Sequence, residues 1–81
     1  MKTSKLPQKS ADYVIGQIAA KIKVLRMKAG YKSSETFAFD NDLPRVQYWR
    51  MEKGTNFTIK GLLRILAIHK ITVEEFFKGV K

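Results

Sequence analysis

A regular apolar stripe in the first half of the chain constrains the fold more than any other feature. Between residues 11 and 29, apolar side chains recur at spacings of three and four, which places them on one face of an α-helix. Gly30 follows, and glycine is common where a helix ends. Such a helix is stable only if other segments cover its apolar face. We therefore expect a long first helix over residues 11–29, with shorter elements packed on it. The stripe consists of Ile15, Ile18, Ile22, Leu25 and Ala29.

The remainder of the chain predicts four shorter helices, because each segment begins with a residue that favours a helix start. Ser and Thr cap helices through their side-chain oxygens, and proline is tolerated in a first turn. Thr72 and Glu75 have the spacing of a capping box. No segment alternates as a half-buried strand does. The chain thus predicts an all-α fold of five helices in a single domain, residues 11–81. The later helices are expected over residues 34–40 after Ser33, 44–53 from Pro44 to the stop at Gly54, 59–70 after Thr58, and from Thr72 onward.

The expected core combines aliphatic and aromatic side chains. Tyr48 and Met51 lie three residues apart in the third predicted helix, so they should point inward together with Leu43. RNA-binding proteins stack bases on aromatics of a β-sheet, and no strand is predicted, so the aromatics are expected in the core. His69 is expected to be half-buried at a helix edge near the fifth helix. The aromatics placed in the core are Phe37, Phe39, Phe76 and Phe77.

The charge balance indicates a polyanionic partner. Sixteen Lys and Arg residues against seven Asp and Glu residues give a net charge of +9, and such a surface attracts nucleic acid. The chain has no cysteine and one histidine, which predicts no metal site. No nucleophile with a matched base and no phosphate-binding loop occurs, so we expect neither enzymatic activity nor a cofactor. No run approaches the ~20 apolar residues of a membrane span, so we expect no membrane partner and a cytoplasmic location.

Residues 1–10 are polar and rich in lysine, and they contain Pro7. This composition predicts a flexible basic N-terminal arm. A basic arm can follow DNA phosphates or enter a groove. A frayed terminus without a role has the same composition, so the sequence leaves both interpretations open.

Residues 33–54 are expected to form a helix-turn-helix, in which two short helices are joined by a tight turn, here the polar residues 40–42. In such a unit the second helix, about residues 44–53, presents its outer face to base edges in the DNA major groove. Arginine can fork onto guanine, glutamine can pair with adenine, and an apolar side chain can contact the thymine methyl group. We expect Arg45, Val46, Gln47 and Arg50 to project outward together, away from Tyr48 and Met51.

Short polar and basic side chains near this helix suit contacts with DNA phosphate. Most follow its end, and two precede the second predicted helix, where the helix dipole attracts phosphate. Trp49 is large for an exposed position, and it is expected either to lie against the sugar-phosphate backbone or to cover a neighbouring helix. The candidate phosphate contacts are Lys32, Ser33, Trp49, Lys53, Thr55, Asn56 and Lys60.

Several of these residues match the spacing of a known pattern. The third predicted helix ends in the order apolar residue, Glu, any residue, Gly. This ending lies at a set distance along the sequence from an Ala in the second predicted helix. The matching residues are Ile22, Leu25, Arg26 and Gly30, then Phe37 and Ala38, then Tyr48 and Met51 to Gly54, then Thr58, Ile59, Leu62 and Ile65, and finally Thr72 to Phe77. From about Ile18 to Phe77 the sequence resembles the Cro/repressor-type helix-turn-helix family, also called the XRE family.

The resemblance implies a five-helix, lambda-repressor-like DNA-binding domain with a helix-turn-helix at its second and third helices. It implies operator binding, usually by a homodimer. It also implies an ion pair between Arg26 and Glu52 that is structural and touches no base. Removing one partner of a buried pair costs roughly 3–5 kcal/mol. The base-reading positions that it implies are Ser34, Pro44, Arg45, Val46, Gln47 and Arg50.

Three functions remain open at this stage. The first is a sequence-specific transcriptional regulator of double-stranded DNA, with Leu63, Ala67, Ile68 and Val80 as a candidate dimer patch. The second is an antitoxin-type module that binds a cognate toxin and its own promoter. The third is a non-specific architectural DNA-binding protein. One fold can serve all three functions, and a selected DNA consensus would favour the first.

Overall fold

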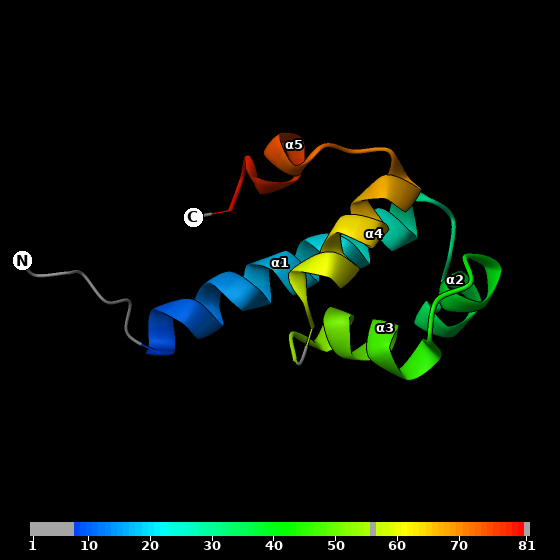
Figure 1. Ribbon diagram of the computed structural model, residues 1–81, viewed down its shortest axis with the longest axis horizontal. Helices are drawn as coiled ribbons and strands as arrows, with labels where there is room; N and C mark the ends of the chain where they lie inside the picture. The colour runs from blue at the N-terminus through cyan, green and yellow to red at the C-terminus, as the bar shows by residue number, and fades with distance from the viewer. Residues whose placement is uncertain (1–7, 56, 81) are drawn as a thin grey trace, which may run out of the picture.

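Five α-helices make up the part of the chain that the computed structural model describes, residues 8–55 and 57–80. They are α1 (Gln8–Lys28), α2 (Ser34–Asp40), α3 (Arg45–Lys53), α4 (Ile59–His69) and α5 (Val73–Phe77), and no strand occurs in these residues (Figure 1). The fold is therefore all-α, as the sequence predicts. None of the described helices is both long and apolar enough to cross a membrane.

Two helix starts differ from those predicted. α1 begins at Gln8 rather than at about Ala11, so the helix includes residues that were assigned to the N-terminal arm. The rest of that arm, residues 1–7, lies outside the described residues. α3 begins at Arg45, and Pro44 is its N-cap with an extended backbone (φ −63°, ψ 120°). Proline offers no side-chain oxygen, so this N-cap makes no side-chain hydrogen bond.

The other helix starts follow from local side-chain chemistry. The Ser33 hydroxyl accepts a hydrogen bond from the Thr36 amide at 3.1 Å, and the Thr58 hydroxyl accepts one from the Gly61 amide at 3.0 Å. The Thr72 amide donates to the Glu75 carboxylate at 3.2 Å, which completes the capping box predicted for α5. These bonds satisfy amides that a helix start leaves without partners.

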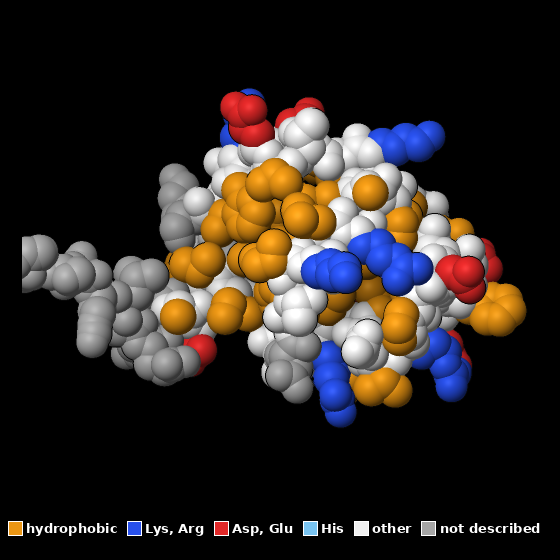
Figure 2. Space-filling view, viewed as in Figure 1, with side chains coloured by type: hydrophobic (Ala, Val, Ile, Leu, Met, Phe, Trp, Pro, Cys, Tyr) orange, Lys and Arg blue, Asp and Glu red, His pale blue; other side chains and the backbone are white. Residues whose placement is uncertain are grey.

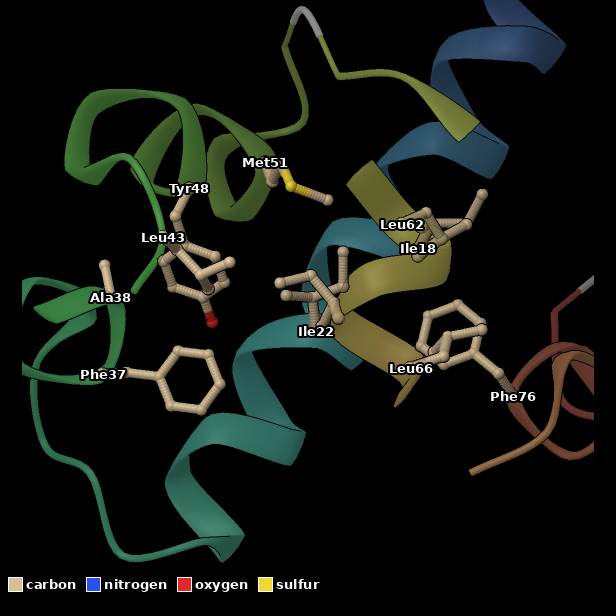
Figure 3. Close-up of a cluster of buried hydrophobic side chains, with 11 residues drawn as sticks. Ile18, Ile22, Phe37, Ala38, Leu43, Tyr48, Met51, Leu62, Leu66 and Phe76 are labelled. Atoms are coloured by element: carbon tan, nitrogen blue, oxygen red, sulfur yellow. The ribbon is translucent and has the colours of Figure 1, made fainter. Parts of the chain in front are cut away.

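The core lies between α1 and α4, with α2 and α3 on one side and α5 on the other (Figure 1). The stripe of α1 packs there through Ile18 and Ile22. Figure 3 shows side chains from all five helices converging, with Phe37 and Phe76 entering from opposite ends. The buried core residues are Ile18, Ile22, Phe37, Ala38, Leu43, Tyr48, Met51, Leu62, Ile65, Leu66 and Phe76.

The surroundings of Phe39 and His69 include features that the sequence did not predict. Phe39 is 78% exposed, so its prediction as a core residue is wrong. It lies four residues after Glu35 and therefore shares the solvent side of α2 with that residue. His69 is half-buried as predicted, and its ring stacks on Phe37 of α2, with centroids 5.2 Å apart, a contact that the sequence did not predict.

The turn between α2 and α3 fixes the start of α3. Asp42 adopts a left-handed conformation (φ 60°), and the Leu43 amide donates to the Ala38 carbonyl at 2.8 Å. The Asn41 side chain donates to the Phe37 carbonyl at 2.9 Å. Arg64 of α4 donates to the Asp42 carbonyl at 3.0 Å. The polar turn is thus tied both to α2 and to α4, and α3 leaves it in a set direction.

Candidate nucleic-acid interface

A buried ion pair joins α3 to α1. The Arg26 guanidinium donates to the Glu52 carboxylate through Nε at 2.8 Å and through Nη2 at 3.0 Å, and both side chains are 6% exposed. Arg26 also donates through Nη1 to the Tyr31 carbonyl at 2.9 Å. The hydrogen bond to Glu52 raises the pKa of Arg26. The pair that the resemblance implied is present, and it directs both residues inward rather than toward a ligand.

Gly54 ends α3 beside α1. Its backbone is left-handed (φ 80°), its amide donates to the Met51 carbonyl at 3.1 Å, and the Thr55 amide donates to the Arg50 carbonyl at 3.0 Å. A Cβ added at Gly54 would lie 3.7 Å from the Cβ of Ala19, within ordinary contact distance. Space alone would admit a side chain, so it is the left-handed backbone that favours glycine there. With Glu52 and Gly54 held against α1, the opposite side of α3 faces solvent.

We call that solvent side the α3 face and define it by the exposed side chains Arg45, Val46, Trp49, Arg50 and Lys53. Val46, Arg50 and Lys53 follow one another at helical spacing, with Val46 60% exposed. The Lys53 ammonium lies 5.4 Å from the centre of the Trp49 ring. Figure 2 shows Lys and Arg side chains standing out along the edge of the molecule that α3 forms.

A groove separates the α3 face from the start of α2. Its volume is about 560 Å³, and Ser33, Ser34 and Glu35 line one wall while Arg45, Val46 and Trp49 line the other. Trp49 is 50% exposed and lines this groove opposite the start of α2. Arg45 donates through Nη1 to the Glu35 carboxylate across the groove, and both side chains remain mostly exposed. An apolar floor with a charged rim thus lies beside the basic face.

Gln47 does not lie on the α3 face. It lines hollows on the other flank of α3, together with Met51 and Gly61 of α4, whereas Arg45 lines the groove on the α2 flank. Gln47 is exposed, as Arg45 and Arg50 are, but it lines a different hollow from Arg45, so its projection together with the two arginines stays a prediction. Gln47 precedes the buried Met51 by four residues and the exposed Arg50 by three, so it lies between the core side of α3 and the α3 face.

Only some of the candidate phosphate contacts are exposed side chains without a hydrogen bond inside the described part of the protein. Lys32, Lys53 and Lys60 are exposed. The Ser33 hydroxyl already caps α2, and the Thr55 hydroxyl donates to the Arg50 carbonyl at 3.4 Å. Ser34 is half-buried, Pro44 is exposed at the start of α3, and Asn56 lies outside the described residues.

Glu35 is the residue of this surface that the sequence prediction missed as a site residue. It was assigned only a favourable place in the first turn of α2, near the positive end of the helix dipole. Its partner Arg45 is ten positions away on another helix, so no periodicity within one helix reveals the pair. The capping pattern at Ser33 was the available signal, because it sets the position of Glu35 on α2.

Comparison with protein-family models, curated proteins and solved structures found no match. The functional inference therefore depends on the geometry and charge of the α3 face. Within the described ranges, no group of three metal-binding side chains comes together.

Proposed function

We propose that this chain is a sequence-specific DNA-binding transcriptional regulator that inserts α3 into the major groove. In this interpretation α2 and α3 form a helix-turn-helix of the Cro/repressor type, within a lambda-repressor-like arrangement of the five helices. The second helix of such a unit reads base edges while the first crosses the backbone. We assign base reading to Arg45, Val46 and Arg50, and phosphate contact to the lysines beside them.

One observation carries the proposal: an exposed helix whose outer face holds Arg, Val and Lys side chains, while its inner face is fixed by a buried ion pair. Rigid placement matters because a base contact needs defined donor geometry. The net charge of +9 supports a polyanionic partner in addition. Base reading by Gln47 is not included, because that residue lies on the flank toward α4.

The homodimer implied by the resemblance stays a prediction, and its surface needs revision. Leu63 is 45% exposed and Ile59, one turn earlier on α4, is 68% exposed. Ile68, in contrast, packs against the core, so it does not belong to the predicted patch with Leu63 and Ala67. Figure 2 shows hydrophobic side chains gathered on the face beside α5. We therefore propose that the dimer surface consists of Ile59, Leu63 and Ala67, which are exposed at helical spacing on α4.

Selection from random duplex DNA, followed by sequencing, tests the proposed function. We expect a two-fold-related consensus with half-sites about one helical turn apart. Strong binding with steep salt dependence but no consensus would contradict a regulator and favour an architectural protein. No binding to DNA at all would contradict both and favour a role in binding protein.

Alanine variants test the assignment of single side chains. Arg45→Ala and Arg50→Ala should each weaken binding to the consensus by roughly 1–3 kcal/mol and relax the preference at one base position. The reason is that each removes a pair of donors to a base edge. Fluorescence anisotropy against the consensus and its single-base variants measures both effects. Equal weakening on every sequence would assign these arginines to phosphate instead.

A further inference from the structure

A carboxylate lies beside the basic surface that we propose as the DNA-binding face. Glu35 lies in the first turn of α2 and lines the groove beside the α3 face with Val46 and Trp49. Its carboxylate accepts a hydrogen bond from Arg45 Nη1. A negative charge at this place opposes the approach of phosphate, so its presence needs a physical reason.

The exposed ion pair contributes too little stability to supply that reason. The Arg45 and Glu35 side chains are 62% and 66% exposed, and exposed ion pairs of this kind contribute little to folding. The buried Arg26–Glu52 pair and the Gly54 turn already hold α3 in place. Loss of the Glu35 carboxylate should therefore leave the fold unchanged.

The pair instead controls the direction of a long side chain. An arginine at the start of α3 can reach either a base edge or the neighbouring phosphates. Glu35 occupies Nη1, and within the described residues nothing accepts a hydrogen bond from Nε or Nη2 of Arg45. Two donors in a fork therefore remain for guanine, which accepts through O6 and N7.

We propose that Glu35 is a positioning and specificity-determining residue: it holds Arg45 toward the base edges and keeps it from pairing with phosphate. This inference rests on the proposed function. Sequence discrimination then arises from two effects of one carboxylate. It orients the arginine for the correct base, and it weakens binding to DNA that offers only phosphates.

Glu35→Gln tests the proposal, with Glu74→Gln as the matched control. Both variants remove one exposed carboxylate, but Glu74 lies on α5, on the far side of the core from α3 (Figure 1). Fluorescence anisotropy measures binding to the selected consensus and to a scrambled duplex. Glu35→Gln should lower the ratio of the two affinities about five-fold, mainly through tighter binding to the scrambled duplex. Glu74→Gln should leave that ratio unchanged.

The Arg45→Ala background separates positioning from general repulsion. If Glu35 acts through Arg45, Glu35→Gln should change base preference at the Arg45 position in the parent chain and not in Arg45→Ala. An unchanged affinity ratio and consensus in Glu35→Gln would overturn the proposal. So would an equal loss of base preference in both backgrounds. A parent chain that selects no consensus overturns the proposed function itself, which is a distinct result.

Discussion

Tyr48 places a buried hydroxyl beside an ion pair that does not use it. Both Glu52 carboxylate oxygens accept hydrogen bonds from Arg26, at 2.8 and 3.0 Å. The Tyr48 hydroxyl is buried nearby, with no hydrogen-bond partner of ordinary geometry in the described part of the chain. Burial raises the pKa of Tyr48, and the Glu52 carboxylate raises it further. The phenol is therefore neutral, and burial separates its hydroxyl donor from water.

Tyr48→Phe should consequently keep or increase stability. A buried donor without a partner costs about 1–3 kcal/mol, and phenylalanine fills the same space without that donor. We expect the free energy of unfolding to stay the same or to rise by about 1 kcal/mol, measured by urea denaturation. Tyr48→Ala, the control for packing, should lose about 3–5 kcal/mol. A clear loss of stability in Tyr48→Phe would mean that the hydroxyl bonds to the ion pair.

His69 should make stability depend on pH. Its ring stacks on Phe37, its Nε2 is buried without a partner in the described residues, and burial lowers its pKa from 6.5. A lowered pKa means that the unfolded chain binds the proton more readily. Stability is therefore full above about pH 6.5, falls as the pH decreases from there toward the lower folded pKa, and levels off below it. The slope cannot exceed about 1.4 kcal/mol per pH unit, and it should be smaller because the ring is only half-buried.

Urea denaturation of the parent chain and of His69→Leu at pH 7.5 and 5.5 measures this effect. Leucine cannot titrate and suits the apolar contact with Phe37. We expect the parent chain to lose more stability than His69→Leu between the two pH values. Identical losses would show that the imidazole does not carry the pH dependence.

At the scale of the elements, the end of α4 contains an unfavourable residue. Lys70 adopts a left-handed conformation (φ 57°), and its amide and that of Ile71 donate to the Ala67 and Leu66 carbonyls, both at 3.1 Å. A side chain in this conformation costs roughly 1 kcal/mol, which glycine avoids. Lys70→Gly should therefore raise the free energy of unfolding by about that amount.

Lys78→Gly is the matched control for this substitution. Lys78 follows α5 with a right-handed helical backbone (φ −56°, ψ −36°), where glycine only adds freedom to the unfolded chain. It should lower stability by roughly 0.5–1 kcal/mol while removing the same charge. If both variants shift the urea midpoint in the same direction, backbone conformation does not explain the effect at Lys70.

The elements were predictable because their start signals are local. Ser33, Thr58 and Thr72 cap helices through bonds to residues three positions away, which a linear sequence reveals. The α3 face was less predictable, because it depends on how α3 is rotated against α1 and α4. Helical spacing from Met51 places Gln47 on the flank toward α4, although its side chain is exposed. The Glu35–Arg45 pair requires the packing of two helices, which no local signal contains.

At the scale of the whole molecule, the positive side chains differ in whether a duplex bound at the α3 face could contact them. The net charge is +9, and among the described residues the lysines and arginines near α3 are the ones placed to contact the same duplex as the α3 face. Lys60 is exposed in the first turn of α4, shortly after the end of α3, whereas Lys78 follows α5 across the core. DNA binding should therefore depend on where a positive charge lies, not only on how many there are.

Salt titration of two single-charge variants tests this distinction. If binding neutralises about six phosphates, the logarithm of affinity should fall with the logarithm of salt concentration with a slope of about −5. Lys60→Ala should make that slope less steep by about one unit and weaken all sequences alike, because phosphate contacts carry no base preference. Lys78→Ala removes the same charge from the far side of the core and should leave the slope unchanged. If both variants reduce the slope equally, the protein attracts DNA through its total charge, and α3 is not the surface that the duplex contacts.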